Sequence, residues 1–247
     1  MTRQRFWAAA LLTGFAQGVL CLPLMADEVK KQESEQKIIE SLEKIVFVPH
    51  DVGAPEVTDA GGVRGISTAP KLLGLAPERL ARSLSPSPTI YWYVSKGTET
   101  PVRFTLFAEG SDAANPLLDI DLGAHAEPGI YAVPLADYGV QLEGMRRYSW
   151  SLDLVSAEGG SSGEPVVQTW LEHSPSADIV AFLETNPPFE QTALLAGEGY
   201  WYDALDVVSE QIEAGDQSVP WREVRAHLLD QVGLKQVAIF DRQQTAQ

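Results

Sequence analysis

The densest aromatic cluster of the chain reads Gly197-Glu198-Gly199-Tyr200-Trp201-Tyr202-Asp203-Ala204-Leu205. Apolar residues then continue at the spacing of a helical face, three, four, seven and eleven positions after Trp201: Ala204, Leu205, Val208 and Ile212. This pattern predicts a helix that buries Trp201, with Gly199 in the turn that precedes it and Gly215-Asp216 at its end.

A weaker copy of the cluster follows in the sequence. Gly199 and Gly233 are 34 residues apart, as are Ala204 and Ala238, and this is the period of tetratricopeptide repeats. Only one repeat is complete, and an isolated repeat cannot bury its own faces, so we expect it to pack on the rest of the protein. The residues expected to have structural roles are Gly199, Trp201, Ala204, Leu205, Trp221 and Gly233.

The segment 175–240 is therefore predicted to be a helical, repeat-like module, with a tail at 241–247. Ser176 is placed to cap a first short helix, and prolines open later ones, as is common in first helical turns. The expected helices cover 177–184, 188–198, the stretch from 201 to Gly215, the stretch from about 218 to Gly233, and a further element at 235–240.

Residues 88–174 have the alternation and the β-branched and aromatic content of strands. Six strands are expected, at 89–95, 102–107, 117–122, 129–135, 148–154 and 166–171. Strands with turns at such short intervals indicate an immunoglobulin-like antiparallel β-sandwich. The predicted fold class is thus α+β, a sandwich followed by a short tetratricopeptide-like α-helical module.

The segment 27–87 reads as a polar tether followed by an arm rich in glycine and proline. It contains one short apolar run, Ile45-Val46-Phe47-Val48-Pro49. We expect the arm to have little regular structure and to lie extended over the next module.

The first 26 residues resemble a secretory signal peptide, with Arg3 and Arg5 ahead of an apolar run and Ala26 before a cleavage point. We expect export to the periplasm, the outside of the cell or its surface; the alternative is an uncleaved anchor, since the run approaches membrane-spanning length. Cys21, the only cysteine, lies in this segment, so a cleaved chain has no disulfide and no thiolate ligand.

The formal net charge is −16, which argues against nucleic acids and anionic membrane surfaces as partners. No cofactor or metal is expected. The histidines His50, His125, His173 and His227 show no metal-binding spacing. Asp119 and Asp121 share one face of a strand, where a solvated face is favoured over a calcium or acid–base site.

Four tyrosines are the candidate interaction residues: Tyr91, Tyr93, Tyr200 and Tyr202. Consecutive helical residues point about 100° apart, so Tyr200 and Tyr202 cannot share the face of Trp201. Docking against the sandwich is favoured for them over a ligand site. Asp203, in the first helical turn, is placed to cap the helix.

Three groups of residues together resemble a known family: Gly61-Gly62-Val63-Arg64-Gly65, then Pro88-Thr89-Ile90-Tyr91-Trp92-Tyr93-Val94, then Gly199 to Leu205 ahead of Trp221 and Val232-Gly233-Leu234. The resemblance is to the bacterial domain-of-unknown-function 928 family and covers roughly residues 60 to 240. It implies an exported bacterial protein with a sheet module and a helical C-terminus, and it transfers no activity.

The leading functional hypothesis is a non-enzymatic interaction or assembly module, because no catalytic constellation is visible. Its partner would be another exported or surface protein, and its oligomeric state stays open. One alternative is a carbohydrate- or peptide-binding domain that uses exposed aromatics such as Tyr91, Tyr93 or Tyr202. Another is a hydrolase based on carboxylates that the sequence does not pair.

Overall fold

The computed structural model describes residues 40–50, 70–112, 114–125, 127–155 and 167–244. The expected signal peptide and most of the tether lie outside these residues, as do the turn at Gly61–Gly65 and the loop at 158–163. Everything below concerns the unit Leu42–Gln247, which contains both the strands and the helices. Within the described residues, no helix is long and apolar enough to cross a membrane.

The larger sheet has five strands in the order β2-β8-β7-β4-β5. Adjacent strands of this sheet are antiparallel, except that β2 runs parallel to β8, so the sheet is mixed. The strands are β2 (Ala81–Ser83), β4 (Val102–Ala108), β5 (Leu118–Asp121), β7 (Arg146–Leu154) and β8 (Val167–His173).

The smaller sheet is antiparallel, with the order β1-β3-β6. It consists of β1 (Leu72–Gly74), β3 (Thr89–Val94) and β6 (Gly129–Pro134), and a 3-10 helix, η1 (Leu135–Tyr138), follows. All six strands expected from the sequence are present, with ends shifted by a few residues. The segment expected to lack regular structure supplies two more, β1 and β2.

The two sheets meet through a glycine and a tryptophan. A Cβ on Gly74 of β1 would lie 2.6 Å from the Trp150 ring of β7, so only glycine lets this strand come so close. Trp150 in turn stacks on Phe104 of β4, with ring centroids 5.9 Å apart. Both side chains are fully buried and form the centre of the core between the sheets.

The C-terminal part of the chain is helical, as the 3.6-residue periodicity predicts. The helices are α2 (Ala177–Leu183), α3 (Pro188–Gly197), α4 (Trp201–Glu213), α5 (Trp221–Gln231) and α6 (Lys235–Gln243). The hydroxyl of Ser176 accepts a hydrogen bond from the Ile179 N–H and caps α2, as predicted. The structure is therefore a mixed α+β fold with two sheets and a helical C-terminal part.

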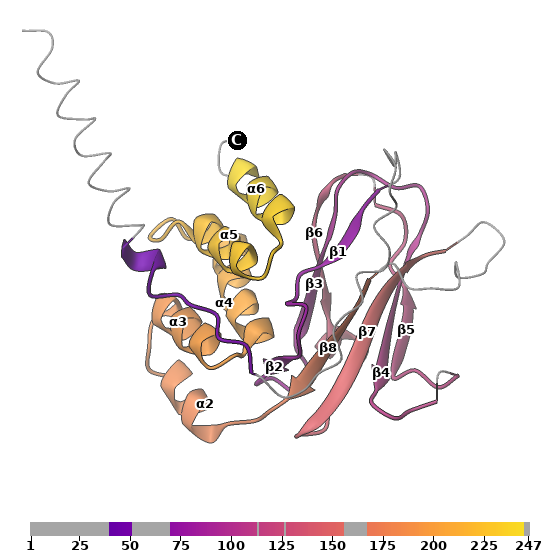
Figure 1. The fold of residues 1–247 in the computed structure, drawn as a ribbon, viewed down its shortest axis with the longest axis horizontal. Helices are drawn as coiled ribbons and strands as arrows, with labels where there is room; N and C mark the ends of the chain where they lie inside the picture. The colour runs from indigo at the N-terminus through magenta and orange to yellow at the C-terminus, as the bar shows by residue number, and fades with distance from the viewer. Residues whose placement is uncertain (1–39, 51–69, 113, 126, 156–166, 245–247) are drawn as a thin grey trace, which may run out of the picture. The chain divides into compact units, whose positions relative to one another are not determined.

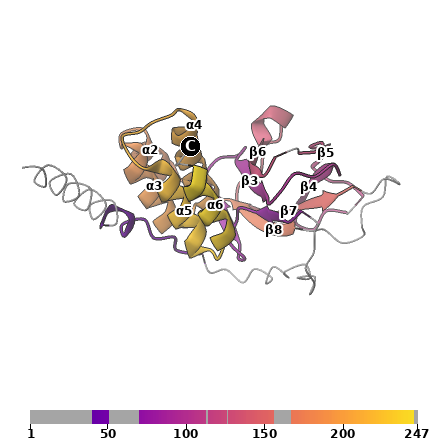
Figure 2. The same ribbon diagram turned by 90° about the horizontal axis from the view of Figure 1, so that it is seen from above.

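Helices α3 to α6 lie to one side of the strands in both views (Figures 1 and 2). Two of the contacts come from tyrosines of β3: Tyr93 packs on Phe240 of α6 with ring centroids 5.1 Å apart, and Tyr91 donates to Asp206 of α4. Ile90 and Trp92, which alternate with these tyrosines, are buried between the sheets. Strand β3 is thus buried on both faces, which explains why nearly all of its residues are apolar or aromatic.

Candidate interaction surface

Gly199 forms the turn between α3 and α4, as predicted. Its φ of +77° lies in the left-handed region, and a Cβ there would come within 2.9 Å of the Val48 carbonyl oxygen. Gly233 has the same role between α5 and α6 with φ of +82°, but nothing lies near its Cβ position. The two glycines thus share a backbone requirement, and only Gly199 is also crowded by the N-terminal segment.

Trp201 is fully buried at the start of α4. Its indole N–H donates to the Leu75 carbonyl at 2.7 Å, and the ring edge meets Phe47 at 4.9 Å between centroids. Ala204 and Leu205 are buried on the same helix, in line with the structural roles predicted for them. Phe47 and Leu75, which contact Trp201, come from the two described stretches of the segment 27–87, one on each side of the gap at 51–69.

Trp221, the remaining residue of the predicted structural set, is buried at the start of α5. Its indole N–H donates to Asp216 Oδ2 at 2.8 Å, in the loop that leaves α4. This bond fixes how α5 begins relative to α4.

The four candidate tyrosines are buried, between 1% and 5% exposed: Tyr91, Tyr93, Tyr200 and Tyr202. This burial does not fit the alternative in which Tyr91, Tyr93 or Tyr202 is an exposed aromatic that binds a carbohydrate or peptide. Tyr202 docks on the larger sheet, as favoured from the sequence: its hydroxyl accepts from Trp150 Nε1 at 3.0 Å and donates to the Trp170 carbonyl at 3.2 Å. The Arg82 guanidinium lies over the ring of Tyr200, 4.5 Å from its centroid.

Asp203 lies in the first turn of α4, as predicted, and its own backbone N–H is one of the donors to its carboxylate. The carboxylate also accepts the backbone N–H groups of Leu84 at 2.7 Å and Ser85 at 3.0 Å, which follow β2. Desolvation raises the pKa of Asp203 to about 7, against the effect of these donors. Asp203 therefore attaches the arm to the helices.

Asp206 lies one turn further along α4. Its Oδ1 accepts the Tyr91 hydroxyl proton at 2.7 Å, and desolvation raises the pKa of both groups. Helix α4 thus uses two of its acids to hold β3 and the chain after β2, which explains their position between apolar residues.

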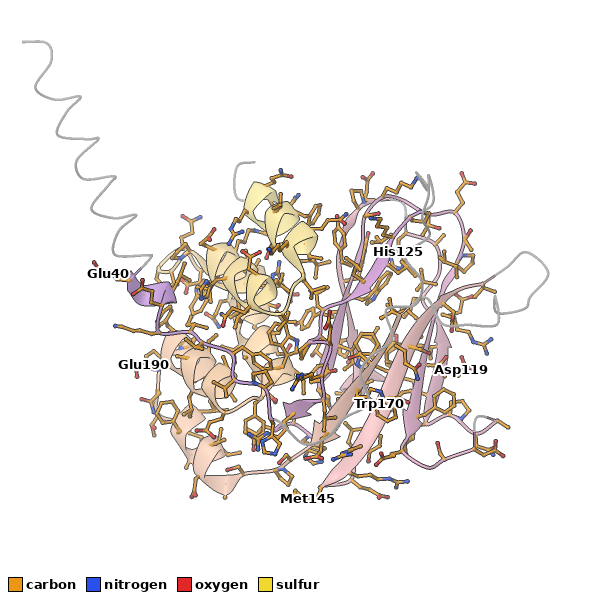
Figure 3. All side chains as sticks on the ribbon, in the orientation of Figure 1. Glu40, Asp119, His125, Met145, Trp170 and Glu190 are labelled. Carbon is orange, nitrogen blue, oxygen red and sulfur yellow. The ribbon has the colours of Figure 1, made fainter. Side chains whose placement is uncertain are left out.

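The histidines occupy unrelated places. His125, labelled in Figure 3, packs against the rings of both Trp92 and Tyr131, 4.8 and 4.2 Å away between centroids, and desolvation lowers its pKa. His173 is buried at the end of β8, His50 is exposed, and His227 contacts the N-terminal segment. Among the residues that the structure describes, no group of His, Cys, Asp or Glu side chains is placed to hold a metal ion.

The two strand carboxylates have structural partners. Asp119, labelled on β5 in Figure 3, forms an ion pair with Arg103 of the neighbouring strand β4. Asp121 accepts the backbone N–H of Gly123 at 2.7 Å, just past the strand. These contacts agree with the interpretation of a solvated, charged sheet face.

Helix α2 is the unusual feature of the surface. Its sequence, Ala177-Asp178-Ile179-Val180-Ala181-Phe182-Leu183, is apolar except for one acid, yet none of these residues is buried. Val180 is 44% exposed. Because a seven-residue helix with this composition gains little by lying open to water, α2 provides an apolar surface available for contact.

Acidic residues predominate in the chain around α2. Residues 148 to 221 contain no lysine or arginine, whereas Asp178, Glu184 and Glu190 are exposed acids on or close to the helix in sequence. Glu190 is seen on α3 in Figure 3. Strand β7 adds one arginine from further away in the chain, because Arg146 pairs with His173 shortly before α2 begins. Helix periodicity predicted the helix, but nothing in the pattern predicted that all of its residues stay at least partly exposed.

The sequence was also compared with known families. The model of the family described as Domain of Unknown Function (DUF928) matches residues 59–240, which is most of the chain. The chain belongs to this family. The resemblance inferred from the aromatic blocks is confirmed, and the DUF928 match includes both sheets and the helices up to Phe240 of α6. No curated protein matches the sequence.

Proposed function

We propose that this DUF928 protein is an exported, non-enzymatic interaction module, and that a partner protein docks on α2. The observation that supports this proposal is the apolar helix whose residues are all at least partly exposed. Side chains such as Val180 would release water from apolar surface when a partner covers them. The surrounding acids favour a partner whose apolar patch is bordered by lysine or arginine.

The proposed setting is the periplasm or the cell surface, because residues 1–26 resemble a signal peptide. Cell fractionation with N-terminal sequencing tests this part. A mature chain that begins at Asp27 in the exported fraction supports export, and an intact Met1 in a soluble cytoplasmic protein refutes it.

We also propose a finer description of the fold: an immunoglobulin-like sandwich followed by a tetratricopeptide-like module. The antiparallel run β8-β7-β4-β5 and the 34-residue spacing of the two turn glycines support it. The parallel strand β2 is a departure from a purely antiparallel sandwich.

The docking proposal is tested with a matched pair of variants. Val180→Asp puts a charge into the exposed surface of α2, and Ile239→Asp makes the same change at a 55% exposed position of α6. Tagged full-length chains are used as baits in the exported fraction, and each captured protein is then purified and tested for direct binding at rising salt concentrations.

We expect one protein that binds the wild-type chain and Ile239→Asp, loses at least ten-fold in affinity for Val180→Asp, and binds more weakly as salt rises. Equal binding to both variants would place the contact elsewhere and refute the docking surface. Retention on glycans alone, without a protein partner, would refute the proposed function.

A further inference from the structure

The segment Leu42–His50 lies on the helices like a bound peptide. Its side chains alternate: Ile45 is completely buried and Phe47 nearly so, whereas Val46 and Val48 are 51% and 50% exposed. Alternation of this kind is the property of an extended strand with one face on a surface. The apolar run recognised in the sequence therefore has one buried and one exposed face, although it belongs to neither sheet.

Gln231 of α5 forms two hydrogen bonds with the backbone of this segment, one to the residue before Val46 and one to the residue after it. Its amide nitrogen donates to the Ile45 carbonyl at 3.0 Å, and its amide oxygen accepts the Phe47 N–H at 2.9 Å. This is the pair of bonds that a neighbouring β-strand would make. His227, one turn earlier, also bonds the Ile45 carbonyl at 3.1 Å, and since a carbonyl only accepts, its Nε2 donates.

The other end of the segment is fixed by the α3–α4 turn. The Val48 N–H donates to the Ala196 carbonyl at 3.0 Å, and Gly199 leaves room for the Val48 carbonyl. Between these bonds the Phe47 ring meets the edge of Trp201. We call Ala196, Trp201, His227 and Gln231 the clamp. Ala196, His227 and Gln231 form hydrogen bonds with the backbone of the segment. The side chains of Ile45 and Phe47 are buried, and Phe47 packs against Trp201.

Recognition by main-chain hydrogen bonds together with alternate side chains is a general mode of binding for extended peptides. None of these contacts requires the segment to come from the same molecule. The family match begins at residue 59, after the segment, and 19 residues separate His50 from Pro70. A link of this length can span up to about 60 Å, which is enough to reach another molecule.

We propose that the clamp is a peptide-binding site for strands of the pattern Ile-x-Phe, and that Leu42–His50 of a second copy of this chain can occupy it. Every copy carries one clamp and one matching segment, so an exchange between two copies keeps every contact seen within one. The site is separate from α2, and the two proposals can fail independently.

The test mixes two full-length variants. An acceptor, Ile45→Asp with Phe47→Asp, keeps the clamp but disables its own segment. A donor, Gln231→Ala, keeps the segment but loses the two hydrogen bonds that Gln231 makes to it. A control for the acceptor, Val46→Asp with Val48→Asp, adds the same charge at the exposed positions of the same segment. Circular dichroism and urea unfolding establish that each variant is folded.

We expect acceptor and donor to form a 1:1 complex with twice the mass of one chain by light scattering, whereas the acceptor alone stays monomeric. A fluorescent peptide of residues 42–50 should bind the acceptor at least ten-fold more tightly than the Val46/Val48 control, whose clamp is already filled. The proposal is overturned if no mixed complex forms, even where the free peptide binds. If the acceptor does not fold, the same peptide is tested for exchange into the wild-type chain, and the absence of any exchange overturns the proposal equally.

Discussion

Arg225 of α5 and Asp241 of α6 form a buried, bidentate ion pair. Arg225 Nε and Nη2 lie 2.6 and 2.7 Å from the two carboxylate oxygens, and the Asp241 side chain is fully inaccessible to solvent. Arg225 also donates to Ser209 Oγ of α4 at 3.1 Å, and Arg222 adds a bond to Asp241 at 3.0 Å. This network joins the last three helices, α4, α5 and α6.

Asp241→Asn should therefore destabilise the protein strongly. It leaves the buried guanidinium of Arg225 without a counter-charge, and loss of one member of a buried pair costs about 3–5 kcal/mol. Urea unfolding measures the change. Glu223→Gln, which weakens the half-exposed pair with Arg242, is the matched control and should cost less than about 1 kcal/mol. Equal losses in the two variants would contradict the role assigned to the buried pair.

A second prediction compares the two turn glycines. Gly199→Ala and Gly233→Ala both force alanine into the left-handed region, at about 1–2 kcal/mol each. Gly199→Ala must in addition move the Val48 carbonyl, which lies 2.9 Å from the new Cβ. The free energy of unfolding should thus fall by at least about 1 kcal/mol more for Gly199→Ala. If the two variants are equally stable, the N-terminal segment does not press on this turn in solution.

The third prediction concerns pH and Asp203. Its pKa is about 7 in the folded protein and about 3.9 in an unfolded chain, so the folded state binds the proton more tightly between these values. Stability from this group is therefore present below about pH 4 and is lost as the pH rises toward 7. Asp203→Asn should flatten the dependence of unfolding free energy on pH across this window. Asp206 and Glu210, whose pKa values are also raised by desolvation, leave part of the slope.

Asp216 is the control for this experiment because its pKa is shifted the other way. The backbone N–H of Ser218, followed by Trp221 and the Ser218 hydroxyl, stabilises its charged form and lowers its pKa. The contribution of Asp216 to the free energy of unfolding is present at neutral pH, and it is lost as the pH falls through the lowered pKa of Asp216 in the folded protein. Asp216→Asn should thus reduce stability at pH 7 and have little effect in acid. Parallel curves for wild type and Asp203→Asn between pH 4 and 7 would contradict the shift assigned to Asp203.

Periodicity predicted most strands and helices of this protein because most of them bury one face. It could not predict β1 and β2, which are three residues long and exist because β3 and β8 offer them backbone partners. Such short strands carry no alternation that a sequence pattern can show. The described end of the predicted arm, residues 70–87, thus has regular structure where none was expected.

The contacts of the candidate residues depend on distant parts of the chain. Helical spacing placed Tyr202 away from the face of Trp201, and the structure buries both because α4 is covered on more than one side. Two further contacts of this kind are the ion pair between Arg225 and Asp241 and the hydrogen bonds of Gln231 to the N-terminal segment. In neither case does a sequence motif or a periodic spacing connect the two partners. A single sequence predicts which face of an element is buried, and it does not predict which partner covers that face.

The last prediction concerns the hydroxyl of Tyr202, which connects α4 to the larger sheet. It accepts the indole proton of Trp150 and donates to the Trp170 carbonyl, and its ring is 1% exposed. Tyr202→Phe keeps the ring but leaves the buried Trp150 N–H unsatisfied, at a cost of about 1–3 kcal/mol. Tyr138→Phe, at a 44% exposed position, is the matched control and should change stability by less than about 0.5 kcal/mol. Urea unfolding followed by tryptophan fluorescence measures both; a Tyr202→Phe variant as stable as the control would show that this bond does not hold the helices to the sheet.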